Sequence, residues 1–149
     1  MRYIEAASPH DMEAFISGII PDLLRVKAQV FIDLYVDEPM GDETSLTSFR
    51  AMVDMAQTKG GLARRSLFSA RRDLLMGVEV DLLQSDQAEH FSRLAHQVIN
   101  AEAWDRDRQI FGTVESPVLV WVDVPAEVLE RALETAREAG ALVHARPMQ

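Results

Sequence analysis

The segment VKAQVFIDLYV, residues 26–36, places an apolar side chain at every second position. These positions are Val26, Ala28, Val30, Ile32, Leu34 and Val36, and the residues between them include Lys27, Gln29, Asp33 and Tyr35. Successive side chains of a strand point to opposite faces of a sheet, so this alternation predicts a strand with one packed face and one face in water. A helix would spread the same apolar residues around its whole circumference, so the pattern favours a strand.

The alternation recurs in residues 74–82. Leu74, Met76, Val78, Val80 and Leu82 take the inward positions, whereas Glu79 and Asp81 take outward ones. A doubly wound parallel sheet is covered on both faces and would not leave two long strands with a wet face. The two segments therefore favour a mixed or antiparallel sheet with helices mainly on one side.

Four helices are predicted from apolar residues that recur every three or four positions. They begin near Ser8-Pro9, Thr44-Ser45, Ser85-Asp86 and Pro125. We expect Pro21 to end the first helix, because proline disfavours the helical conformation of the residue before it. The apolar stripe of the third helix extends to Ile99, and glycines follow the second and fourth helices at Gly60-Gly61 and Gly140.

Three further strands complete the predicted order β-α-β-α-β-α-β-α-β. They are Met1–Ala6, Ala141–Ala145 and Val118–Val124, the last so continuously apolar that we expect a central strand covered on both faces. Residues 102–108 are highly charged and are predicted to form a loop. The order predicts a single α+β domain over residues 1–149, with a ferredoxin-like plait favoured and a flavodoxin-like three-layer α/β sandwich as the alternative.

Composition excludes several classes of protein. Of 149 residues, 48% are apolar and 26% are charged, which is typical of a folded domain, and no apolar run approaches the ~20 residues that span a bilayer. No signal-peptide pattern is evident, so we expect a cytoplasmic, bacterial-type protein. The absence of cysteine excludes disulfides and thiolate chemistry. A net charge of −9 argues against general nucleic-acid binding.

One segment opposes that acidic charge. TKGGLARRSLFSARR, residues 58–72, contains five cations and no carboxylate, whereas the rest of the chain has ten basic and 24 acidic residues. Its candidate anion- or partner-binding residues are Lys59, Gly60, Gly61, Arg64, Arg65, Arg71 and Arg72. Paired arginines can hold a phosphate or carboxylate, but the Lys-Ser/Thr of a phosphate loop is missing. Three interpretations remain: arginines paired with the protein's own carboxylates, a partner surface, or a small-anion site.

Four carboxylates form a second candidate surface. If the strands around residues 26–36 and 74–82 are neighbours, then Asp33, Asp37, Glu79 and Asp81 project to the same side. Such a cluster is compatible with an ordinary solvated face, with an acidic contact face for a basic partner, or with Mg²⁺, Ca²⁺ or acid–base chemistry.

The remaining chemistry-bearing side chains give no motif. His90 and His96 are six positions apart, which on a helix separates them by about 120°, so they do not converge on a metal. Trp121 is expected in the core. Trp104 is predicted either to anchor a partner or to cover the end of the third helix.

These features favour a small acidic binding or regulatory module that acts through protein–protein contact, with no catalytic residue, metal or cofactor. An immunity or inhibitor protein is one concrete form. The alternative is a domain, possibly enzymatic, that binds a small anion or phosphorylated metabolite through residues 59–72. A third hypothesis is a homo-oligomer in which an exposed strand face or edge pairs with a second copy.

Overall fold

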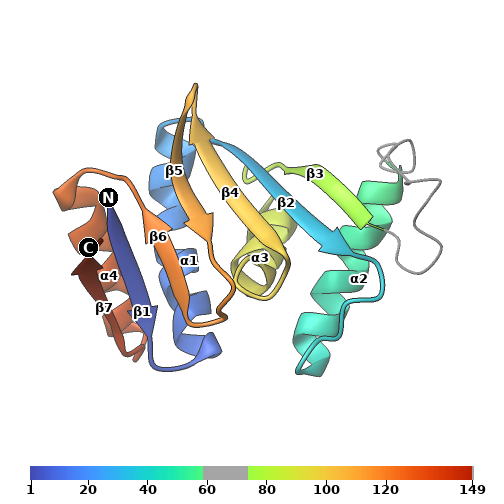
Figure 1. The fold of residues 1–149 in the computed structure, drawn as a ribbon, viewed down its shortest axis with the longest axis horizontal. Coiled ribbons are helices and arrows are strands. Elements are labelled where there is room, and N and C mark those ends of the chain that lie inside the picture. Colours follow the sequence, from blue (N-terminus) through green and yellow to red (C-terminus); the bar gives the residue numbers. More distant parts are fainter. Residues whose placement is uncertain (59–73, 149) are drawn as a thin grey trace.

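The computed structural model describes residues 1–58 and 74–148, and in these ranges it contains one antiparallel sheet and four helices (Figure 1). The chain order is β-α-β-α-β-α-β-β-β-α-β. The elements are β1 (Arg2–Ala6), α1 (Pro9–Arg25), β2 (Gln29–Tyr35), α2 (Glu43–Thr58), β3 (Leu74–Val80), α3 (Ser85–Leu94), β4 (Asn100–Asp105), β5 (Arg108–Thr113), β6 (Leu119–Val122), α4 (Ala126–Glu138) and β7 (Val143–Pro147).

The seven strands lie side by side in the order β3-β2-β4-β5-β6-β1-β7, and every neighbouring pair is antiparallel. The helices lie behind the sheet in Figure 1, with α1 packed against α3 and α4, and α2 against α3. The predicted α+β class is therefore confirmed, but the ferredoxin-like plait is not. No described helix lies on the other side of the sheet, which we call the open face.

The alternating segment of residues 26–36 contains strand β2 as predicted, with Val30, Ile32 and Leu34 buried toward the helices. The strand begins at Gln29 rather than at Val26, because the preceding residues close helix α1. The N–H of Lys27 donates to the carbonyl of Leu24 (3.0 Å) and that of Ala28 to Leu23 (2.9 Å). This pair of bonds is a Schellman motif, and it places Lys27 in the left-handed region at φ 54°.

Helix α1 also passes through Pro21, where we expected it to end. Pro21 lies on the exposed side of the helix, where water can bind the backbone carbonyl that loses its partner. The following turn is held by the buried Leu23 and by Asp22, whose carboxylate pairs with Arg25 at 2.7 Å and with Arg131 at 2.5 Å. Burial and these ion pairs outweigh the lost hydrogen bond.

The segment predicted as a loop, residues 102–108, instead belongs to the hairpin of β4 and β5. Ala101 and Ala103 of β4 are fully buried toward the helices, whereas Glu102 takes the open face and Arg106 and Asp107 form the turn. Arg106 adopts φ 58° in that turn, a conformation that two-residue hairpin loops require. Two small alanines bury little area and give a weak apolar pattern, which explains the wrong prediction.

Three other features of the fold differ from the predictions. Strand β6 is buried on one face only, through Val120 and Val122, and Trp121 lies half-exposed on the open face rather than in the core. Helix α3 ends at Leu94, so that Ile99 is 42% exposed ahead of β4. The last strand, β7, lies slightly later in the chain than predicted.

Helices α1 and α4 approach each other closely at Gly18. A β-carbon there would lie 2.9 Å from the carbonyl oxygen of Ala132, a backbone atom that cannot move aside cheaply. We expect Gly18→Ala to lower the free energy of unfolding by about 1–3 kcal/mol, although the same exchange elsewhere in a helix raises it by about 1 kcal/mol. Urea denaturation measures the difference. Ser17→Ala, on the exposed side of α1, is the control, and equal stability of the two variants would contradict this packing.

Candidate functional site

The open face carries one row of side chains that crosses all seven strands. Strand pairing aligns these residues from one edge of the sheet to the other, and we call them the cross-sheet row: Arg146, Tyr3, Trp121, Gly112, Glu102, Phe31 and Glu79. Their neighbours along each strand point to the helices, since the buried residues alternate with them. The row therefore extends across the whole width of the open face.

Aromatic side chains are divided between the two faces of the sheet. Both tryptophans and both tyrosines lie half-buried at open-face positions together with Phe31; the four are Tyr3, Tyr35, Trp104 and Trp121. The other phenylalanines of the described residues are buried on the helix side. Tryptophan and tyrosine combine apolar area with a polar tip, which suits surfaces that alternate between water and a partner.

Trp121 lies across the middle of the row. A β-carbon on Gly112, its neighbour on β5, would lie only 2.5 Å from the indole Nε1 of Trp121. Glycine is therefore the residue that lets the indole lie flat over the central strand. No sequence pattern indicates this arrangement, because an apolar strand such as β6 gives no sign of which neighbour has room for its tryptophan.

One end of the row contains Arg146, whose side chain contacts residues of the neighbouring strand β1. The guanidinium carbon of Arg146 lies 5.7 Å from the centre of the Tyr3 ring, a cation–π contact. Glu5, on the same strand as Tyr3, is 3.5 Å from Arg146 Nε and 3.6 Å from His144 Nε2. Strand β7, which carries Arg146 and His144, is one edge of the sheet.

The other end of the row is acidic. Phe31 lies between Glu79 on β3 and Glu102 on β4, its direct cross-strand neighbours. Glu79 is exposed and makes no ion pair with any residue that the structure describes. The predicted adjacency of the two alternating strands is thus confirmed, and their wet face is the acidic end of the open face.

Asp33 has a structural part in that end of the sheet. Its carboxylate accepts a hydrogen bond from the backbone N–H of Gly77 at 2.6 Å and from the side-chain amide of Asn100 at 3.2 Å. Gly77, at φ 60°, lies where the pairing of β2 and β3 shifts register. Asp33 therefore fastens the bulge of the edge strand to β4 across β2, which no sequence pattern indicated.

Asp81 and Asp37 lie at turns rather than in a cluster with the other two carboxylates. Asp81 Oδ1 accepts the N–H of Leu83 at 3.0 Å, and its own N–H donates to Gln87 Oε1 at 2.8 Å, so it shapes the turn into α3. Asp37 lies in the turn after β2. Of the four predicted acidic residues, Asp33 and Glu79 share the open face, and the described residues contain no group that could hold a metal.

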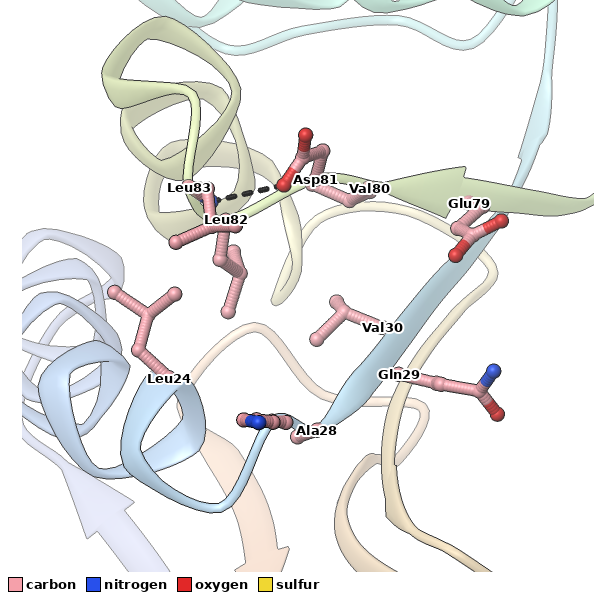
Figure 2. Close-up of a pocket in the computed structure, with 10 residues that line it drawn as sticks. Leu24, Ala28, Gln29, Val30, Glu79, Val80, Asp81, Leu82 and Leu83 are labelled. Atoms are coloured by element: carbon pink, nitrogen blue, oxygen red, sulfur yellow. Dashed lines mark hydrogen bonds between the residues drawn. The ribbon is translucent and has the colours of Figure 1, made fainter.

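A pocket of about 610 Å³ lies beside the acidic end (Figure 2). Leu24, Leu82 and Val30 point into it, from the end of α1, the turn before α3 and β2. Asp81 is turned away toward Leu83, which is 82% exposed. The pocket is therefore lined mainly by apolar side chains, and the carboxylates at its rim do not converge on one point.

A separate polar pocket lies where the N-terminal ends of α1 and α2 meet the residues after α3. His96 is only 5% exposed there, and its Nδ1 has no hydrogen-bond partner in the described part of the chain. Burial lowers the pKa of His96 from 6.5 to about 4, against a smaller opposing effect of Asp42. Hydrogen bonds from the backbone and side chain of Ser45 lower the pKa of Asp42.

His90 lies elsewhere in this region and is hydrogen-bonded to Ser48, with 2.9 Å between its Nδ1 and Ser48 Oγ. The two histidines of this region therefore do not share a ligand site. The candidate residues of the basic segment, from Lys59 to Arg72, lie outside the described residues.

Comparison with known proteins adds no relative: no family model, curated protein or solved structure matches this chain. Among the described residues, no helix combines the length and apolar character needed to cross a membrane. Any statement on function therefore depends on the geometry of the chain itself.

Proposed function

We propose that this protein is a small binding or regulatory module that acts by contact with another protein, and that the acidic end of the open face is its contact surface for a basic group. The observation that carries this proposal is the position of Phe31 between Glu79 and Glu102. A half-exposed aromatic ring flanked by carboxylates can pack against the aliphatic stem of a lysine or arginine while the carboxylates pair with its charge.

The net charge of −9 supports the same proposal. An acidic surface accelerates the encounter with a basic partner, and a rim of charge discourages unsuitable partners. An immunity or inhibitor protein that neutralises a basic toxin or nuclease is one concrete form of this function. The alternative, a small-anion domain that uses residues 59–72, stays a prediction, because those residues lie outside the described ranges.

Removal of the aromatic ring tests the proposal. We expect immobilised wild-type protein to retain a partner from cell extract at low salt, and less of it at moderate salt, whereas Phe31→Ala retains at least tenfold less under both conditions. Retention is measured by quantitative mass spectrometry, and circular dichroism verifies that the variant is folded.

Val26→Ala is the matched control, because it shortens an exposed apolar side chain at the end of α1 that lines neither the open face nor the pocket beside its acidic end. Its retention should equal that of the wild type. Equal retention by Phe31→Ala and wild type would exclude the open face as the contact surface.

A further inference from the structure

We infer that the basic group bound by the acidic end of the open face belongs to a second copy of this chain, so that two copies pack face to face about a two-fold axis parallel to strand β5. This inference rests on the proposed function, since it names the partner of the same surface.

The cross-sheet row is complementary to its own reverse. Gly112 on β5 is the fourth of seven positions, so β5 is the central strand of the sheet. A two-fold axis along this strand reverses the row of the second copy. Arg146 of one copy then lies over Glu79 of the other, and Tyr3 lies over Phe31. Each basic end meets an acidic end, and aromatic rings meet between them.

The direction of the axis follows from charge. A two-fold axis across the strands would instead place each residue of the row over itself, and Glu79 would face Glu79 of the second copy. Like charges in direct contact are unfavourable, so the axis along β5 is preferred. An isologous contact of this kind closes at two copies and buries both open faces at once.

Neighbouring positions tolerate this arrangement. Glu5 of one copy comes near Asp33 of the other, but both carboxylates already have partners in their own chain. Glu5 is paired with His144 and Arg146, and Asp33 accepts hydrogen bonds from Gly77 and Asn100. Two sheets that pack at about 30° to each other keep such a contact aligned over the central strands.

A dimer of this kind requires the whole open face. Six inter-strand spacings of about 4.8 Å make the face roughly 29 Å wide, and strands of four to seven residues make it roughly 13–23 Å long. This projects to roughly 500 Å², and the accessible area of its side chains is larger. Stable interfaces bury about 800 Å² per partner, so the whole open face is used rather than a part of it.

A charge exchange tests the inference by sedimentation velocity. Wild-type protein should sediment as a species of about 33 kDa, twice the chain mass of 16.7 kDa, at micromolar concentration. Arg146→Glu and Glu79→Arg should each raise the dimer dissociation constant at least tenfold. The double variant restores the pair in the opposite sense and should return within about threefold of the wild type. Glu134→Arg, on the exposed side of α4, is the control that changes charge without touching the open face.

Three outcomes would overturn the inference: a wild-type monomer at every concentration, single variants that dimerise as well as the wild type, or a double variant no better than the singles. The proposed function fails on a different result. A monomer that still needs Phe31 to retain another protein would refute the second copy as partner and leave the contact surface in place.

Discussion

The His96→Leu variant is expected to lose less stability on acidification than the wild-type protein. The difference between the two losses of unfolding free energy is about 2 kcal/mol from pH 7.5 to pH 5, and about 3 kcal/mol from pH 7.5 to pH 3. The imidazole is 5% exposed with an unpartnered Nδ1, and burial lowers its pKa to about 4. In the unfolded chain the pKa is near 6.5.

The sign follows from these two values. Above pH 6.5 the imidazole is neutral in both states and does not make stability depend on pH. As the pH falls below 6.5, the unfolded chain takes up a proton that the folded protein binds only near pH 4. The unfolded state is therefore favoured progressively, and the stability present above pH 6.5 is lost as the pH approaches 4.

Urea denaturation at several pH values measures this loss. The quantity compared is the slope of unfolding free energy against pH, so a constant offset caused by the leucine does not matter. Asp42, Glu13, His10 and Arg93 line the same pocket and are unchanged between the two proteins. His10→Gln is the control, because His10 is 90% exposed and its variant should keep the wild-type slope. A wild-type slope in His96→Leu would show that this histidine is not the acid-sensitive group.

The sequence predicted those parts of the fold in which large side chains alternate. Val30, Ile32 and Leu34 could form one face of a strand only, and Asp33 with Phe31 necessarily took the other face. Strand β4 was missed because Ala101 and Ala103 bury their positions fully with little apolar area. Small side chains suffice where helices approach the sheet closely, and this closeness is a property of the packed structure.

Only part of the open face could be predicted from the sequence, for a related reason. In β6 the run Leu119-Val120-Trp121-Val122 is equally consistent with a strand covered on both sides and with one that shows an aromatic face to water. The choice depends on Gly112, nine residues away, whose missing side chain makes room for the indole. Strand order decides such cases, and strand order is set by all seven strands together.

Replacing Phe111 with alanine is expected to lower the free energy of unfolding by about 3–5 kcal/mol, the largest effect we predict for one side chain. Phe111 is fully buried on the helix side of β5, and its ring centre lies 5.9 Å from that of Phe91, at 60° to it. The ring therefore joins the central strand to α3. Its loss removes this aromatic contact and leaves a cavity that the two rigid elements cannot close.

Two comparisons make this prediction specific. Phe111→Leu keeps most of the side-chain volume, so its free energy of unfolding should fall by no more than about half as much. Phe31 is half-exposed on the open face, so Phe31→Ala should lower the free energy of unfolding by only about 1 kcal/mol. Because association adds stability that depends on concentration, all variants are unfolded in urea at the same low protein concentration. A loss below about 1.5 kcal/mol for Phe111→Ala would mean that β5 does not rest on α3. A loss for Phe31→Ala as large as that for Phe111→Ala would place Phe31 in the core, and the open face would then not be the surface that a partner contacts.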